Sequence, residues 1–138
     1  METKKSILVL GSDGLLGSAA KRSEYLNSNF YIHFSNRHEA ELTDLNQVEN
    51  LFKKIRPNIV INCAGKVGGI LANTQNQFEF LHENLKITLN IFEMMKSRKN
   101  LTLINFGSSA IYPKNASNPL KEEYLMTGEL EPSNASYS

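Results

Sequence analysis

The sequence has a single cysteine, Cys63, and no long run of apolar residues. One cysteine excludes an internal disulfide framework and a metal site built from several cysteines. No apolar run reaches the ~18 residues that a membrane-spanning helix needs. The apolar stretch near the N-terminus is also too short for the hydrophobic region of a signal peptide. These absences predict a reduced, cytoplasmic protein without a membrane partner.

The chain also carries little net charge, because 15 Lys and Arg residues face 14 Asp and Glu residues and leave a formal charge of +1. This balance gives no electrostatic reason to bind nucleic acid or an anionic membrane. The three histidines have no zinc-ligand spacing, so no metal site is predicted. The 138 residues, 41% hydrophobic and 21% charged, are enough for one globular domain at most.

Short apolar runs and longer stretches of helical spacing alternate along the chain. The runs predict strands at residues 7–10, 30–34, 59–61 and 101–106, and the longer stretches predict helices at 15–26, 45–55 and 77–96. The last of these helices has one face with the apolar residues Phe78, Leu81, Leu85, Leu89 and Phe92. This alternation predicts an α/β fold, a doubly wound parallel sheet of the Rossmann type. The tail after Tyr112 is expected to be a loop, which leaves that sheet incomplete.

Three glycines lie between the first predicted strand and the first predicted helix, in Gly11-Ser-Asp-Gly14-Leu-Leu-Gly17. In a dinucleotide-binding turn one glycine makes the turn, one lets the backbone approach the pyrophosphate, and one lets the helix pack on the sheet. The helix N-terminus then presents N–H groups to the phosphates. The alternative is a glycine-rich turn that serves packing alone. Cofactor contacts are therefore predicted at Gly11, Ser12, Asp13, Gly14, Leu15, Leu16 and Gly17.

The spacing of these glycines resembles that of the extended short-chain dehydrogenase/reductase family. At the end of the second strand, where NAD enzymes usually carry an acid for the ribose diol, this chain has Asn36 and Arg37. Arg37 would form a charge-assisted hydrogen bond with a 2′-phosphate, which favours NADP over the alternative, NAD. The competing interpretation of Arg37 is a solvated surface residue. Asp13 argues against NADP, because a carboxylate repels a 2′-phosphate.

Two further segments match cofactor positions of that superfamily. Asp44 and Leu45 follow at the distance where its members place an aspartate beside the adenine, although a helix N-cap explains Asp44 equally. Ala64 and Gly65 close the third strand, where small residues let the ribose and phosphates lie against the backbone. Cys63 is expected to be a small buried residue, because no His or acid is placed to activate it.

Adjacent serines follow the fourth predicted strand, in Gly107-Ser-Ser-Ala-Ile-Tyr-Pro113. The carboxyl end of a parallel strand is where doubly wound folds carry out their chemistry. Taken alone, these residues are explained equally well by a serine-rich turn. The resemblance to the superfamily implies that Ser108 and the later Tyr137 form its proton-relay pair.

Three segments resemble the GDP-L-fucose synthase branch of that family: Lys66-Val-Gly-Gly-Ile-Leu-Ala-Asn73, Gly107-Ser-Ser-Ala-Ile-Tyr-Pro-Lys114 and Leu125-Met-Thr-Gly-Glu-Leu-Glu-Pro-Ser-Asn134. The resemblance implies an NADPH-dependent oxidoreductase and isomerase, a 3,5-epimerase and 4-reductase of a GDP-4-keto-6-deoxy sugar. It implies that Ser108 and Tyr137 are catalytic and that Asn84 supports the site. It also implies a homodimer for the complete protein. Lys66 is expected to contact the cofactor, and the nucleotide sugar is expected to contact Val67, Gly68 and Ser109.

Two departures from that branch affect the expected activity. Where its members carry a cysteine proposed as the acid/base for epimerisation, this chain has Ala110. The lysine of the Tyr-x-x-x-Lys motif is missing, because the chain ends one residue after Tyr137. Residues 1–138 are therefore expected to be the N-terminal part of an NAD(P)-binding Rossmann domain, inactive without its substrate lobe. The alternatives are a reductase without epimerase activity on another GDP- or dTDP-linked 4-keto sugar, and a nucleotide-binding module without turnover.

Overall fold

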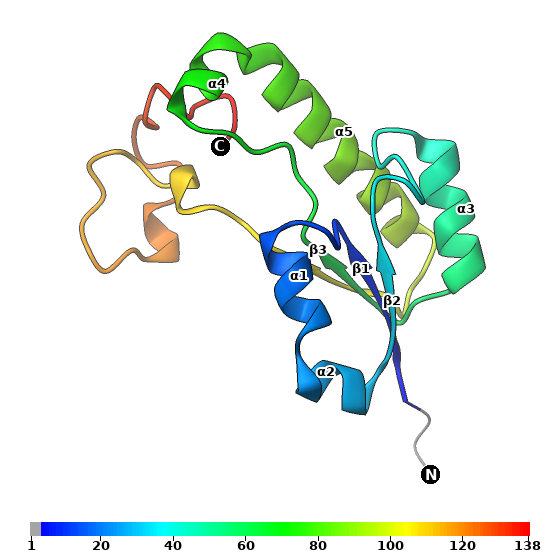
Figure 1. The fold of residues 1–138 in the computed structure, drawn as a ribbon. Helices are drawn as coiled ribbons and strands as arrows, with labels where there is room; N and C mark the ends of the chain where they lie inside the picture. Colours follow the sequence, from blue (N-terminus) through cyan, green and yellow to red (C-terminus); the bar gives the residue numbers. More distant parts are fainter. Residues whose placement is uncertain (1–3) are drawn as a thin grey trace. The chain divides into compact units, whose positions relative to one another are not determined.

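The computed structural model describes residues 4–138 and contains a four-stranded parallel sheet (Figure 1). Its strands are β1 (Ser6–Leu10), β2 (Tyr31–Ser35), β3 (Ile59–Asn62) and β4 (Thr102–Asn105), in the order β2-β1-β3-β4. The register pairs Leu10 of β1 with Ser35 of β2 and with Asn62 of β3, so the carboxyl ends of these strands meet at one edge. The predicted α/β fold with a parallel sheet is confirmed.

Helices connect the strands, but not all of them as predicted. The helices predicted at 45–55 and 77–96 are confirmed, whereas the single helix predicted over 15–26 is wrong. It is interrupted at Ser23, whose backbone N–H donates to Ala20 and whose Oγ caps the next helix by accepting from Leu26 N at 3.3 Å. The helices are α1 (Leu15–Lys21), α2 (Glu24–Asn29), α3 (Leu45–Ile55), the unpredicted α4 (Ile70–Gln75) and α5 (Gln77–Lys96), with 3₁₀ turns η1 (Ser109–Ile111) and η2 (Glu122–Tyr124).

The chain divides into two compact units. The first comprises the chain up to Gly65 together with Leu85–Phe106, and it contains the sheet. The second comprises Lys66–Asn84 and Gly107–Ser138, and it contains α4, the start of α5 and the loops after β4.

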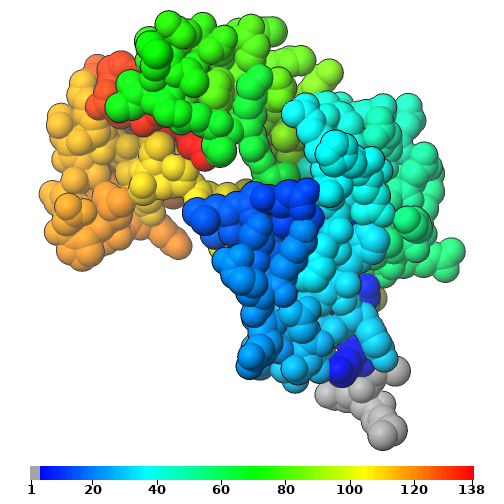
Figure 2. Space-filling model, viewed as in Figure 1, coloured from blue at the N-terminus to red at the C-terminus, as the bar shows by residue number. Residues whose placement is uncertain are grey.

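Both faces of the sheet in the first unit are covered at its centre, around β1. Leu8 and Leu10 pack with residues of α3 and α5 on one face, and Ile7 and Val9 pack with residues of α1 and α2 on the other. All four of these strand residues are fully or almost fully buried, which explains why β1 is apolar without alternation. Burial of side chains of this size stabilises the fold by ~1.5–3 kcal/mol each. Figure 2 shows the α1–α2 segment, in blue, on the surface of this unit beside the cyan residues of β2.

The apolar face predicted for the last helix is an exposed face of α5. Its residues are between 46% (Leu81) and 69% (Phe78) exposed. The buried apolar residues of α5 lie on a different stripe and are Phe80, Ile87, Ile91 and Met94. The helix therefore has two apolar stripes, and helical spacing alone does not say which of them packs against the sheet.

Candidate active site

The glycine loop follows β1, and its three glycines have different surroundings. Gly11 has a φ of +73°, and a Cβ there would lie 2.7 Å from Ala64 Cα. A Cβ at Gly17 would lie 2.4 Å from Gly11 O. Packing therefore explains both of these glycines. A Cβ at Gly14 would have only an ordinary contact, 3.4 Å from Gly11 O, so packing does not explain this third glycine.

The loop lies at the point where the strand order reverses, because β1 has β2 on one side and β3 on the other. Doubly wound folds bind their ligands in the crevice outside the carboxyl ends of the strands at such a point. Cys63 N–H donates to Leu10 O at 3.0 Å, and the buried Asn62 accepts from Ala64 N at 3.0 Å. These bonds hold residues 62–64 beside the glycine loop. Leu15, 87% exposed, begins α1 at the same edge.

A cluster of polar side chains joins the glycine loop to the end of β2. Asp13 accepts hydrogen bonds from Lys21 Nζ and from Asn36 Nδ2, both at 2.8 Å. The bond from Lys21, followed by that from Asn36, holds the pKa of the Asp13 carboxyl below its usual range. The ammonium group of Lys21 offsets the negative charge that argued against a 2′-phosphate at this place. Sequence reasoning missed Lys21, which its position in the last turn of α1 brings back to the loop.

Arg37 lies on the surface after β2 and is paired within the chain. Its Nε donates to Glu41 Oε2 at 2.6 Å. Burial alone raises the pKa of the Glu41 carboxyl, but the hydrogen bonds from Arg37 and Thr43 outweigh it and the pKa is lowered. Glu41 is therefore a carboxylate, and a 2′-phosphate at Arg37 has to share the guanidinium group with it.

Asp44 is the N-cap of α3. Its Oδ1 accepts from the backbone N–H of Asn46 at 2.9 Å and of Gln47 at 3.3 Å. The side chain and the backbone of Gln47 are the main reasons why the pKa of the Asp44 carboxyl is lowered. Leu45 follows as a partly exposed residue at the start of the helix. Within residues 4–138, the capping hydrogen bonds explain the aspartate at position 44. A contact of Asp44 with the adenine stays a prediction.

In the second unit, one asparagine fixes the backbone of Lys66. Lys66 N–H donates to Asn84 Oδ1 at 2.7 Å, and Asn84 Nδ2 donates to Lys66 O at 3.0 Å. The Lys66 ammonium group pairs with Glu83 and lies 5.7 Å from the centre of the Phe80 ring. The Asn84 amide thus bonds both the N–H and the carbonyl group of one residue, and its role in supporting the active site stays a prediction.

A cavity of about 280 Å³ in the second unit gathers the predicted catalytic and substrate residues. Segments far apart in the sequence supply its lining. Ser108 Oγ caps η1 by accepting from Ala110 N at 3.1 Å, which fixes the serine side chain at the start of that turn. Tyr137 lies near the other end of the segment Gly107–Ser138, in a turn where its backbone N–H donates to Asn134 O at 2.9 Å. The lining residues are Val67, Gly68, Asn73, Ser108, Ser109, Ala110, Asn134 and Tyr137.

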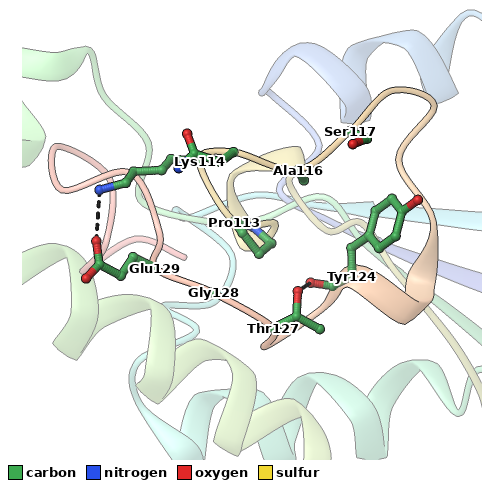
Figure 3. A pocket seen from close by; sticks show the side chains of 9 residues that line it. Pro113, Lys114, Ala116, Ser117, Tyr124, Thr127, Gly128 and Glu129 are labelled. Carbon is green, nitrogen blue, oxygen red and sulfur yellow. Dashed lines mark hydrogen bonds and ion pairs between the residues drawn. The ribbon is translucent and has the colours of Figure 1, made fainter.

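A second cavity, of about 420 Å³, lies within one loop of this unit and is shown in Figure 3. Lys114 and Glu129 close one side through an ion pair of 2.8 Å and a backbone hydrogen bond of 2.9 Å. Tyr124 and Thr127 line another side, and the threonine hydroxyl donates to Tyr124 O at 2.8 Å. This cavity holds no predicted site residue.

Other reactive groups offer no competing site. Burial raises the pKa of the half-buried Cys63 thiol, so the thiol form is favoured over the reactive thiolate. Within residues 4–138, no group of three or more His, Cys, Asp and Glu side chains is arranged to hold a metal ion. The same residues include no helix long and apolar enough to cross a membrane.

Comparison with known proteins agrees with this geometry. The sequence profile of the NAD dependent epimerase/dehydratase family matches residues 7–138. The chain belongs to this family. Within it, the GDP-L-fucose synthase of Sinorhizobium fredii is 40% identical over 134 residues, which cover 97% of this chain and 42% of that protein. The GDP-L-colitose synthase of Yersinia pseudotuberculosis is 34% identical over 132 residues, which cover 96% and 42% respectively.

Solved structures of such enzymes share the fold. A GDP-mannoheptose C4 reductase from Campylobacter jejuni with NADP bound has a TM-score of 0.88 and 33% identity, and the match covers 99% of this chain and 40% of that one. This family member therefore has a Rossmann-type α/β fold. It spans about 42% of the length of the curated relatives it matches.

Two cavity residues were not singled out from the sequence. Asn73 ends the segment that resembles the GDP-L-fucose synthase branch, and Asn134 precedes Tyr137. Both lie in segments that resemble that branch, but their residue types alone did not distinguish them from other polar positions. Their place in the cavity is visible only once the distant segments are folded together.

Proposed function

We propose that this chain is the cofactor-binding and catalytic part of an NADP-dependent nucleotide-sugar 4-ketoreductase of the GDP-L-fucose synthase type. The observation that carries the proposal is the cavity in which Ser108 and Tyr137 lie together with Val67 and Gly68. The similarity to GDP-L-fucose and GDP-L-colitose synthases supports a GDP-linked sugar as the substrate.

The first unit has the features needed to hold NADP. Gly14 has the open space for a pyrophosphate that packing leaves unexplained. Asn36 and Arg37 lie where the adenosine ribose and its 2′-phosphate are expected, and Ala64 and Gly65 line the same sheet edge. When bound, NADPH supplies a hydride to the keto carbon of the sugar. The remaining cofactor contacts are proposed at Gly11, Ser12, Asp13, Leu15, Leu16, Gly17, Asp44, Leu45 and Lys66.

The second unit supplies the proton. Tyr137 donates its hydroxyl proton to the oxygen of the keto group as the carbon gains the hydride, so the product is an alcohol and the residue becomes a tyrosinate. Ser108 orients that oxygen by donating a hydrogen bond. Ser109 is proposed to contact the sugar beside it. The lysine of the Tyr-x-x-x-Lys motif places an ammonium group near the tyrosine, which favours the tyrosinate form and so lowers the barrier to this transfer.

Ala110 favours reduction without epimerisation as a second candidate function. Its side chain lines the cavity at the position where the resemblance implies a cysteine. Epimerisation at C3 and C5 requires a group that removes and returns protons, and a methyl group does neither. The isomerase activity of the GDP-L-fucose synthase type is therefore proposed to be weak in this chain.

A chimera tests both functions. It joins residues 1–138 to the part of the Sinorhizobium fredii GDP-L-fucose synthase that follows its matching segment. The chimera should oxidise NADPH with GDP-4-keto-6-deoxy-D-mannose, because the added part supplies the lysine of the Tyr-x-x-x-Lys motif and a substrate lobe. Failure of a folded chimera to do so would refute the ketoreductase proposal.

In the same chimera, Ala110→Cys should raise proton–deuterium exchange at C3 and C5 of the substrate by at least about 10²-fold, because a thiol restores general acid–base catalysis. Ala116→Cys, in the loop of the second cavity, is the control and should leave the exchange rate unchanged. Rapid exchange with Ala110 in place would contradict the role given to this position.

Arg37→Ala should weaken NADPH binding about 10-fold or more and leave NADH binding almost unchanged, because only NADPH carries the 2′-phosphate. Fluorescence titration of both cofactors measures the two dissociation constants. Arg22→Ala, an exposed arginine after α1, is the control and should change neither. Equal losses for both cofactors with Arg37→Ala would rule out a 2′-phosphate contact.

The complete protein is further proposed to be a cytoplasmic homodimer. The exposed apolar stripe of α5 supports dimerisation, because large exposed apolar patches mark interaction surfaces. The near-neutral charge supports small-molecule chemistry rather than nucleic acid or membrane binding.

A further inference from the structure

Asn73 has a buried oxygen without a partner. The residue is 3% exposed, and its Nδ2 donates to Gly68 O at 2.8 Å and to Gly69 O at 3.2 Å. Because two carbonyl groups must face the amide nitrogen, the orientation of the side chain is fixed. Its Oδ1 then has no hydrogen-bond donor among the described residues.

An acceptor in this state calls for a donor from outside the chain. A buried polar atom without a hydrogen bond is destabilising, and native proteins leave few of them. Asn73 lines the cavity that also holds Ser108 and Tyr137, so this cavity is the place from which a ligand would supply the missing donor. The oxygen is neutral and only accepts, which suits an O–H group and excludes a phosphate, since a phosphate diester carries no donor.

The segment that carries Asn73 is held in place before any ligand binds. Asn84 fixes Lys66 at its start, and Asn73 itself bonds the two glycines in its middle. A Cβ at Gly68 would lie 2.8 Å from Phe80 Cζ, so this part of the backbone packs closely on α5. The oxygen is thus preorganised, and a site built in this way discriminates strongly against a ligand that lacks the matching hydroxyl.

The geometry points to Asn73 Oδ1 as the acceptor for one ring hydroxyl group of the nucleotide sugar, and so as a residue that determines which sugar is bound. This inference rests on the proposed function and deepens it. A purely structural asparagine would instead stabilise the loop and treat all sugars alike.

The test is an NMR titration of the isotopically labelled chimera of residues 1–138 with the downstream part of the Sinorhizobium fredii enzyme, because that part supplies the lobe that holds the sugar. The ligands are GDP-mannose, its 2-, 3-, 4- and 6-deoxy analogues, and GDP. In the chimera with Asn73 in place, GDP-mannose should shift the Asn73 side-chain amide resonances, and GDP should not. One analogue should bind about 3- to 10-fold more weakly and leave those resonances in place, because it lacks the donor hydroxyl.

Two variants assign that discrimination to Asn73. Asn73→Ala should bind this analogue and GDP-mannose equally. Asn76→Ala should keep the discrimination, because Asn76 bonds the carbonyl of Ala72 in the same helix but does not line the cavity. Discrimination that survives Asn73→Ala would overturn the inference. If that variant does not fold, the amide resonances of the chimera with Asn73 in place decide: no shift with any sugar overturns the inference.

NADPH separates this inference from the proposed function. A chimera with Asn73 in place that binds NADPH and GDP-mannose but does not discriminate among the sugars refutes the role of Asn73 alone. A folded chimera that binds neither NADPH nor GDP-mannose refutes the proposed function, and the inference with it.

Discussion

Tyr137→Phe should lower the rate of 4-keto reduction by about 10²–10⁴-fold in the chimera of residues 1–138 with the downstream part of the Sinorhizobium fredii enzyme. The substitution removes the hydroxyl proton and keeps the ring, so the shape of the cavity is preserved. NADPH oxidation followed by absorbance measures the rate, and binding of NADPH should be unchanged. Tyr124→Phe is the matched control, because Tyr124 lines the second cavity and its loss of a hydroxyl should leave the rate unaltered.

Residues 1–138 alone should give no measurable oxidation in the same assay. Tyr137 lies one residue from the end of this polypeptide, so the lysine that favours the tyrosinate and the lobe that holds the sugar are both supplied by the chimera. Positioning of the reactants contributes as much to the rate as proton transfer or more. Robust turnover by residues 1–138 would show that the lysine and the lobe are not needed. Robust turnover by the Tyr137→Phe chimera would show that the proton comes from another group.

Gly14→Val should abolish NADPH binding and leave the fold intact. Gly14 has a φ of −75°, which any L-residue adopts, and the nearest atom to an added Cβ is 3.4 Å away. A valine therefore fits the free protein. Its branched side chain then fills the space that the pyrophosphate needs. Fluorescence titration measures NADPH binding, and circular dichroism measures the fold.

Two other glycines serve as controls for this experiment. Gly69 caps α4 with nearly the same backbone, a φ of −71°, and no atom within 4 Å of an added Cβ, so Gly69→Val should leave NADPH binding unchanged. Gly17→Val should destabilise the protein, because the new Cβ would lie 2.4 Å from Gly11 O. A folded Gly14→Val protein with normal NADPH affinity would leave the loop with a packing role only.

The features that sequence predicted well depend on local patterns. All four strands lie within one residue of their predicted ends, because each is formed by a short run of mainly apolar residues. The N-cap Asp44 and the bounds of α3 follow from the same local chemistry. The break at Ser23 is local as well, but the hydrophobic pattern does not reveal it. The Ser23 hydroxyl caps a new helix while the apolar residues keep their helical spacing.

The rest depends on contacts between residues distant in the sequence. The choice between the two apolar stripes of α5 is made by the sheet on which it packs. The hydrogen bond from Asn36 to Asp13 depends on how the end of β2 returns to the glycine loop, 23 residues earlier in the sequence. The unpaired oxygen of Asn73 is evident only after every neighbouring donor has been placed.

The bond between Lys66 and Asn84 has a consequence for how this protein tolerates change in length. These two residues begin and end the stretch that leaves the first unit and returns to it along α5. The two hydrogen bonds between them hold the ends of that stretch together, so that the stretch forms a closed loop. The entropy of closing such a loop grows slowly, and doubling its length costs only about 0.6 kcal/mol. A flexible insertion between α4 and α5 should therefore leave the two hydrogen bonds of this anchor in place.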